Sequence, residues 1–147
     1  MQRLSFAGAV QAEEMVPFYI QPRTTAAVRE LGNAFATSDP KREFLVARTG
    51  AQQATWFFLP DKELDYPEPK LTGRLEGDRL TVTAQTLVRD LALFVDRLGP
   101  DAEIDDQLIT LLPGESWSFA LRGLEGVEVD ELLKPPIMNC ANRFGRR

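Results

Sequence analysis

Four acidic side chains crowd one short stretch of the chain: Asp101, Glu103, Asp105 and Asp106. Carboxylate oxygens are the ligands that Ca²⁺ prefers, so this stretch could form a cation site. It lacks the glycine and the distant bidentate glutamate of an EF-hand loop. A solvated acidic loop is the other interpretation, and it is the one we favour.

Glu115 follows this cluster and could in principle pair with Asp105. Two carboxylates that flank a glycosidic bond can act as acid and nucleophile in its cleavage. Nothing in the sequence sets these two at the required separation, so the pair remains a weak hypothesis.

The sequence contains no histidine and a single cysteine, Cys140. Without histidine, the Ser-His-Asp and Cys-His nucleophile pairs, histidine metal sites and histidine proton shuttles are all excluded. We interpret Cys140 as a surface thiol near the C-terminus. We therefore assign no catalytic, cofactor-binding or metal-binding residue, and no cofactor.

Aromatic residues offer one further candidate site, a sugar-binding platform made by Trp56, Phe57 and Phe58. Alternation along a strand would direct Trp56 and Phe58 into a core. Phe57 and Tyr66 are then the better candidates for an exposed aromatic surface. Weak contact with carbohydrate is accordingly one partner interaction that we consider.

The stretch from Asp105 to Leu121 indicates the kind of element that must position these residues. Its apolar run stops at Pro113-Gly114, a pair suited to the two central positions of a tight turn. Beyond the turn, Trp117, Phe119 and Leu121 alternate with small residues, which is typical of a strand with one buried face. This pattern predicts a corner of an antiparallel β structure, with Trp117 in its core.

Further strands are predicted at regular spacing on either side of turn residues. They cover 44–49, 54–59, 71–76, 79–86, 91–95 and a short last strand within 127–133. Gly77-Asp78 is a hairpin signal, and Leu80, Val82 and Ala84 are expected to face inward. Six or seven short strands of this kind predict an all-β, immunoglobulin-like antiparallel β-sandwich over residues 37–134, followed by a C-terminal tail at 135–147.

The opening residues, 1–36, are predicted to belong to another sheet. One strand is expected to end near Leu4, a second to cover Val16–Ile20, and 25–31 could be either a strand or a helical turn. So few short strands cannot bury both faces of a sheet, so we expect them to need a partner from outside residues 1–36. The polar, Gly- and Pro-containing stretch 32–42 is the predicted linker.

Composition limits the function classes. The chain has 147 residues, 44% of them hydrophobic, 27% charged, and a net charge of −5, values typical of an ordinary globular domain. A negative net charge argues against nucleic acid as a partner. No apolar run approaches a membrane span and no signal pattern opens the chain, so we expect no membrane partner and leave the compartment open.

Four segments in order resemble the C-terminal immunoglobulin-like domain of glycoside hydrolase family 2 β-mannosidases. They read FLVART, ATWFFLPDKELDYPEPKL, LTVTAQTLVRDLALFVD and DDQLITLLPGESWSF, and together they fall within residues 42–129. The family pattern has an aromatic strand ending in a proline-lysine stretch, then an Arg-Asp-Leu (here Arg89-Asp90-Leu91), then a Leu-Leu-Pro-Gly-Glu turn. This chain departs from the pattern at Gln107 and Thr110, where the family often has Asn and Asp.

The resemblance implies a specific role. Enzymes of this family remove terminal non-reducing β-D-mannose with retention, using two glutamates on a TIM barrel of about 250 residues. The chain shows no such barrel, so no catalytic residue carries over. Residues 1–36 would be the closing strands of the preceding β-sandwich plus a linker, and the remaining domains of the parent glycosidase would be the partner. The alternatives are an autonomous carbohydrate-binding module and an interaction sandwich.

Overall fold

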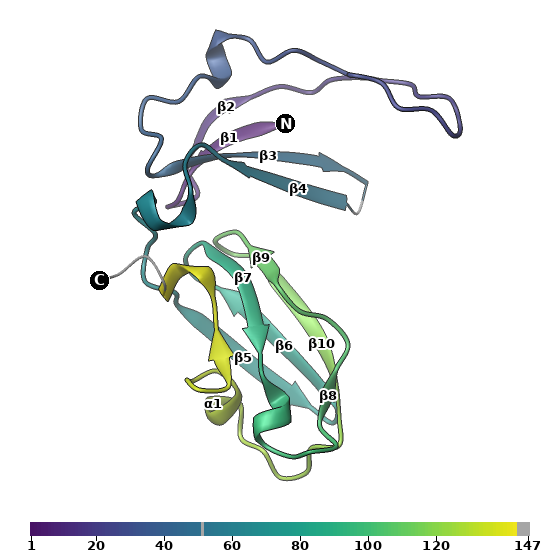
Figure 1. The fold of residues 1–147 in the computed structure, drawn as a ribbon, viewed down its shortest axis with the longest axis vertical. Helices are drawn as coiled ribbons and strands as arrows, with labels where there is room; N and C mark the ends of the chain where they lie inside the picture. Colours follow the sequence, from purple (N-terminus) through teal and green to yellow (C-terminus); the bar gives the residue numbers. More distant parts are fainter. Residues whose placement is uncertain (51, 144–147) are drawn as a thin grey trace.

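The computed structural model describes residues 1–50 and 52–143. The chain is all-β, with antiparallel sheets and one short α-helix, and it forms two lobes (Figure 1). The N-terminal lobe is a single four-stranded sheet, and the C-terminal lobe packs a four-stranded and a three-stranded sheet face to face. The predicted all-β sandwich is confirmed. Within the described residues, no helix is long and apolar enough to cross a membrane.

The N-terminal sheet has the strand order β2-β1-β3-β4. Its strands are β1 (Gln2–Ser5), β2 (Val10–Glu13), β3 (Glu43–Thr49) and β4 (Gln52–Phe57). β3 and β4 are the strands predicted at 44–49 and 54–59. β1 lies between β2 and β3, with Leu4 opposite both Val10 and Phe44. The strand pairing therefore joins β3 and β4 to the opening strands of residues 1–36, and not to the sandwich.

A long connection, residues 14–42, runs over the outer face of this sheet (Figure 1). The strand expected at Val16–Ile20 is absent there, and its only regular element is a 3-10 helix at Asn33–Phe35. Phe35 is buried, so the predicted linker also contributes to packing. The linker prediction rested on polar composition, which does not show that one apolar residue is covered.

Glu43, the first residue of β3, connects the end of this connection to the sheet through its carboxylate. Its carboxylate forms an ion pair with Arg3 at 2.7 Å and accepts a hydrogen bond from the Thr37 hydroxyl at 2.6 Å. Burial alone would raise the pKa of Glu43, but the bonds from Thr37, Arg3 and Ser38 outweigh it and hold that pKa below its ordinary value. The ionised carboxylate is thus part of the folded structure.

The sandwich is built from seven strands and a few short helical turns. One sheet, in the order β5-β6-β10-β8, contains β5 (Leu71–Glu76), β6 (Arg79–Ala84), β10 (Ser116–Arg122) and β8 (Glu103–Ile104). The other, in the order β11-β7-β9, contains β11 (Met138–Asn139), β7 (Val88–Leu93) and β9 (Ile109–Leu111). Helix α1 covers Val129–Leu132, and 3-10 helices lie at Asp61–Glu63, Val95–Arg97 and Ala141–Arg143.

The core of the sandwich follows the predicted alternation. Leu80, Val82 and Ala84 are all fully buried, and Phe119 packs opposite Leu80 from the neighbouring strand. The hairpin at Gly77-Asp78 joins β5 to β6 as expected, with Gly77 at φ +61°. Local turn chemistry and a period of two were sufficient to predict this hairpin.

The last predicted strand, within residues 127–133, is wrong. The chain forms helix α1 there, and Leu132 enters the core with no exposed surface. A short apolar run does not distinguish a strand from a buried helical turn. Asp130 and Glu131 lie in the first turn of α1, where carboxylates interact favourably with the helix N-terminus.

The residues expected to form a C-terminal tail, 135–147, contribute to the core as far as they are described. β11 pairs with β7, and Ile137 and Met138 are buried against the sandwich. Cys140 is only 2% exposed, so the prediction of a surface thiol is wrong. Burial raises the pKa of this thiol, which keeps it protonated and unreactive.

A second apolar cluster joins the two lobes. The inner face of the N-terminal sheet supplies Leu4, Phe44 and Val46, and the sandwich supplies Leu87 and Leu112. Aromatic rings fill the space between them: the rings of Phe6 and Tyr66 are stacked at 5.3 Å, and those of Phe44 and Phe57 at 5.3 Å. Because this cluster takes residues from both lobes, it fixes the lobes against each other.

Candidate functional site at the junction of the two lobes

Arg89, on β7, forms a polar cluster with the segment that links the lobes. Its guanidinium forms an ion pair with Asp61 and donates a hydrogen bond to the Tyr66 hydroxyl at 2.6 Å. The Tyr66 hydroxyl in turn donates to Asp61 Oδ1 at 2.8 Å. The guanidinium carbon also lies 4.1 Å from the centre of the Phe57 ring, a cation–π contact. We call Arg89, Asp61, Tyr66 and Phe57 the junction cluster.

The electrostatics of the junction cluster favour positioning and not proton transfer. Burial works to lower the pKa of Arg89, but its bond to Tyr66 and the nearby carboxylates raise it overall. Burial is also the main reason that the pKa of Tyr66 lies well above its usual range. Arg89 therefore stays cationic and Tyr66 neutral near neutral pH, which suits hydrogen bonds that hold the linking segment in place.

Asn142 supports the junction cluster from the C-terminal end of the described chain. Its Oδ1 accepts a hydrogen bond from the Arg89 backbone N–H at 2.8 Å. Its Nδ2 donates to the carbonyls of Leu87 at 2.7 Å and Pro67 at 3.1 Å. The side chain is fully buried. Nothing in the local sequence signals this role, because all three partners are distant in the chain.

An open cleft lies between the lobes, where β4 faces β9 and the start of β10. We call it the inter-lobe cleft, and its volume is about 560 Å³. Gln53 and Thr55 line one wall, and Trp117 lies in the other. Arg48 and Glu115 form an ion pair across the gap between the lobes.

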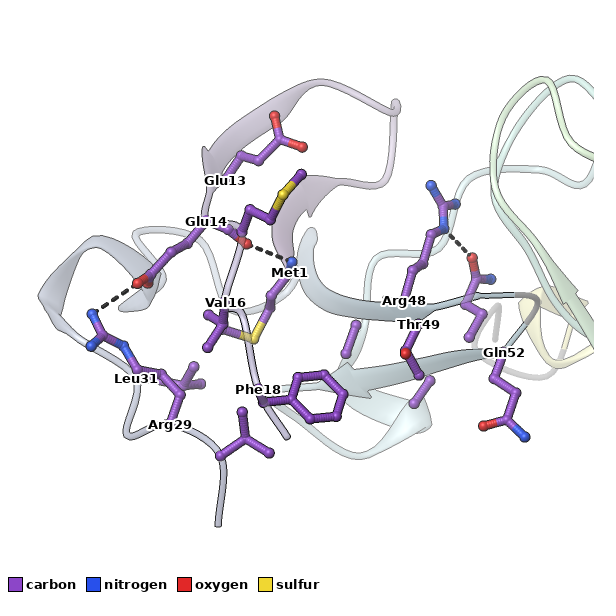
Figure 2. Close-up of a pocket in the computed structure, with 15 residues that line it drawn as sticks. Met1, Glu13, Glu14, Val16, Phe18, Arg29, Leu31, Arg48, Thr49 and Gln52 are labelled. Atoms are coloured by element: carbon purple, nitrogen blue, oxygen red, sulfur yellow. Dashed lines mark hydrogen bonds and ion pairs between the residues drawn. The ribbon is translucent and has the colours of Figure 1, made fainter. Parts of the chain in front are cut away.

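A second depression, the outer groove, lies on the opposite face of the N-terminal sheet. Figure 2 shows Val16 and Phe18 of the long connection beside β3 and β4, with an ion pair of 2.8 Å between Glu14 and Arg29 at one end. Its volume is about 760 Å³, and most of its lining side chains are apolar or uncharged. Among the described residues that line the outer groove, the charged side chains of Glu14 and Arg29 are paired with each other.

Three of the acidic residues singled out by the sequence, Glu103, Asp105 and Asp106, interact with β10 or with a neighbour in their own loop. Asp105 Oδ1 accepts a hydrogen bond from the Ala120 N–H at 2.9 Å, and Asp106 Oδ1 accepts one from the Gln107 N–H at 2.8 Å. Glu103 lies 4.0 Å from Arg122. In the part of the chain that the structure describes, no group of three or more His, Cys, Asp or Glu side chains could hold a metal ion.

Asp105 and Glu115 are not brought together. Asp105 pairs with Ala120 of β10, five residues beyond Glu115. At the rise of a β-strand this is about 16 Å, well beyond the separation that glycoside cleavage requires. Glu115 is occupied elsewhere, since it pairs with Arg48 and accepts the Leu112 N–H at 2.9 Å.

The predicted exposure of the aromatic residues is largely wrong. Trp56 is 67% exposed and Trp117 is 41% exposed, although both were expected in the core. Tyr66, expected at the surface, is buried, and Phe57 packs on Phe44 between the lobes. Alternation separates the two faces of a strand but does not tell which face another lobe will cover. Here the sandwich covers the face that carries Phe57.

The two departures from the family pattern have roles inside this chain. The Gln107 side chain accepts the Leu93 N–H at 2.9 Å and donates to the Leu93 carbonyl at 2.8 Å. Thr110 donates to Asp90 Oδ1 at 3.3 Å. Both side chains therefore connect the segment around β9 to β7.

A comparison with protein-family models gives no match to this chain, and a search of curated proteins finds no relative. The sequence singles out Phe57 and Tyr66 for a different role, exposed contact with a sugar, and does not indicate that they form a cluster with Arg89 and Asp61 or that Asn142 supports it. Arg89, Asp61 and Phe57 nevertheless lie within the segments that carry the family resemblance, and that is the signal that could have pointed to them.

Proposed function

We propose that this chain is a non-catalytic C-terminal accessory domain of a β-mannosidase-type enzyme of glycoside hydrolase family 2. The parent enzyme would hydrolyse terminal non-reducing β-D-mannose residues with retention. The observation that supports this proposal is the junction cluster. Asp61 and Phe57 come from one of the four resembling segments and Arg89 from the next, and these residues are in direct contact.

Contact between the segments matters because it gives the resemblance a physical basis. A motif scattered over separate surfaces could arise by chance from turn and strand composition. Residues that build one polar cluster around the half-buried Arg89 are instead in contact because the lobes dock.

The apolar surface of the N-terminal lobe also supports the proposal. Val10, Met15, Phe18, Tyr19 and Trp56 are each more than half exposed. Exposed apolar side chains gathered on one lobe are typical of a surface that another protein part covers. We interpret this surface as the one that docks on the remaining domains of the parent enzyme.

The experiment begins with the native polypeptide. An antibody against this chain should detect, in the source cells, a polypeptide of about 90 kDa or more, the sum of a barrel and several sandwich domains. The purified polypeptide should hydrolyse 4-nitrophenyl β-D-mannopyranoside, and nuclear magnetic resonance should show the β-anomer as first product. A polypeptide of 16.5 kDa, or a large one without this activity, would refute the proposal.

A variant at the exposed surface sharpens the test. Tyr19 is 85% exposed, so Tyr19→Ser should leave the thermal midpoint of the separate 147-residue chain unchanged. In the parent enzyme the same substitution should lower the midpoint, because the side chain would be covered there. Equal midpoints in both settings would show that this surface is not a docking surface.

An autonomous carbohydrate-binding module is the second candidate function. The observation that favours it is the exposed Trp117 in the inter-lobe cleft, where polar side chains surround an aromatic ring. A native polypeptide of 16.5 kDa that retains a β-linked oligosaccharide on a column would support this candidate over the first.

A further inference from the structure

We propose that the inter-lobe cleft is a binding site for a short, neutral oligosaccharide, with Trp117 as the surface on which a sugar ring stacks. The proposal deepens the carbohydrate-binding candidate above by naming the site. It is equally compatible with the accessory-domain proposal, because it concerns binding by this chain and not hydrolysis by a parent enzyme.

The dimensions and position of the cleft suit a small ligand. Its volume of about 560 Å³ lies in the range of sites that bind small molecules, and such sites often form where two domains meet. β4 of the N-terminal sheet provides one wall, and the segments around β9 and the start of β10 provide the other. The shared apolar core behind these walls fixes their separation.

Trp117 is the aromatic component of the site. On the same face of β10, Phe119 and Leu121 are buried, whereas Trp117 is 41% exposed at the open end of the sandwich. A large indole ring left partly uncovered there presents a flat apolar surface with a polar N–H at its edge. The apolar face of a pyranose ring packs on such a surface, while the sugar hydroxyls point sideways toward polar groups.

Polar side chains on the facing wall of the cleft lie where those hydroxyls would be. Gln53 and Thr55 line that wall, and amides and hydroxyls can both donate to and accept from a sugar hydroxyl. The Ser116 hydroxyl is bonded to that of Thr83 at 2.7 Å on the other face of β10, away from Trp117. A site with these groups can distinguish sugars by the positions of their hydroxyl groups and does not require a charge on the ligand.

The charge at the cleft explains why a neutral ligand fits. The one carboxylate in the lining, Glu115, is already paired with Arg48 and also accepts a backbone N–H. A charged sugar would have to displace this pair, because it would compete with one partner and repel the other. A neutral saccharide can bind with the ion pair intact.

Leu108 is the second, independent observation. Its φ is +59°, a left-handed conformation that is unfavourable for a branched residue, and its side chain is 65% exposed in the lining of the cleft. The bonds of Gln107 to Leu93 on one side and the pairing of Ile109 with Leu91 on the other hold it there. Residues kept in such conformations gather at ligand sites.

The two tryptophans allow a direct test, because Trp117 lines the inter-lobe cleft and Trp56 does not. Thr55 lines the cleft, so the adjacent Trp56 points to the other face of the N-terminal sheet. In the full 147-residue chain, Trp56→Phe leaves Trp117 as the single indole reporter, and Trp117→Phe leaves Trp56. Each variant is titrated with β-1,4-mannotriose, cellotriose and N-acetylated chitotriose while its fluorescence emission is recorded.

We expect at least one trisaccharide to produce a saturable emission change in the Trp56→Phe protein and none to do so in the Trp117→Phe protein. Adding Thr55→Val to Trp56→Phe should weaken that binding about tenfold, and adding Gln53→Ala should weaken it further. Ser116→Ala is the matched control and should leave the affinity unchanged, because the Ser116 hydroxyl lies on the other face of β10 from Trp117. Gln53 is exposed and Thr55 is half-buried, so both variants should fold, which circular dichroism checks.

The proposal is overturned if no trisaccharide changes the Trp117 emission up to about 10 mM, ten times the concentration that half-saturates a 1 mM site. It is also overturned if the saturable change follows Trp56, or if Thr55→Val and Gln53→Ala both leave the affinity unchanged. None of these results would alter the mannosidase activity of a larger polypeptide, so this proposal and the accessory-domain proposal fail separately.

Discussion

Replacing Asn142 with alanine is the sharpest test of how the two lobes are held together. The substitution removes the acceptor for the Arg89 N–H and the donor to the Leu87 and Pro67 carbonyls. Asn142 is fully buried, and alanine leaves a small void in which these groups have no replacement partner in the protein. The backbone that positions the Arg89 guanidinium is loosened at the same time.

The expected loss in the free energy of unfolding follows from the three lost hydrogen bonds. A buried polar group left without a partner costs about 1–3 kcal/mol. The bond to the Leu87 carbonyl is buried, whereas those to the Arg89 N–H and the Pro67 carbonyl are half-buried, so water can replace part of them. Counting the equivalent of two groups in full gives a loss of about 2–6 kcal/mol in the free energy of unfolding. For a chain of this length that is a fall of about 10 °C in the thermal midpoint.

Urea unfolding followed by tryptophan fluorescence measures this loss. The matched control is Asn139→Ala, which removes a single half-buried bond from the Cys140 N–H to Asn139 Oδ1 and should cost about 1 kcal/mol. If Asn142→Ala lost no more than this control, Asn142 would not be the structural tie that its hydrogen bonds indicate.

Three further predictions follow from single residues. In Gly123→Ala the new Cβ would lie 2.1 Å from the Asp101 carbonyl oxygen at φ +68°, so urea unfolding should show a loss of at least about 3 kcal/mol. Gly126→Ala, at φ +67° with no neighbour within 4 Å, should lose only about 1–2 kcal/mol; equal losses would contradict this account. Glu43 has a folded pKa below its ordinary 4.5, so its stabilisation is present above that pH and is lost as pH falls through the folded pKa. Glu43→Gln should flatten the fall of the thermal midpoint between about pH 5 and pH 3, and an unchanged acid slope would count against it. Leu108→Gly should raise stability by about 0.5–1 kcal/mol, since relief of about 1–2 kcal/mol of left-handed strain exceeds the entropic cost of glycine, while trisaccharide binding weakens. A less stable Leu108→Gly protein would show that the conformation is not strained.

Local patterns in the sequence were sufficient for much of the sandwich. The Gly77-Asp78 turn and the alternation of Leu80, Val82 and Ala84 predict a hairpin with one buried face, and the structure has it. The Pro113-Gly114 corner is also local, since proline sets φ at one position and glycine supplies the φ of +87° at the next. Such features need no knowledge of distant residues.

Features that depend on distant partners could not be predicted. The alternation around Trp56 gives two faces, but only the docking of the sandwich decides that Phe57 is the covered one. Asn142 is a polar residue near the end of the chain, and its burial depends on carbonyls at Pro67 and Leu87. The junction cluster has the same origin, because Asp61 and Arg89 meet only when the lobes dock.

The central position of β1 in its sheet has a consequence for the order of folding. β3 and β4 follow each other closely in the chain and can pair within microseconds, but β1 pairs with β3 only after a loop of about 40 residues has closed. During synthesis β1 therefore emerges before β3, and the apolar cluster between the lobes stays incomplete until closure of this loop brings Leu4 and Phe6 to Phe44. Loop closure entropy grows slowly with length, so doubling the connection of residues 14–42 would cost only about 0.6 kcal/mol. This connection is accordingly the place where the chain should best tolerate an inserted sequence.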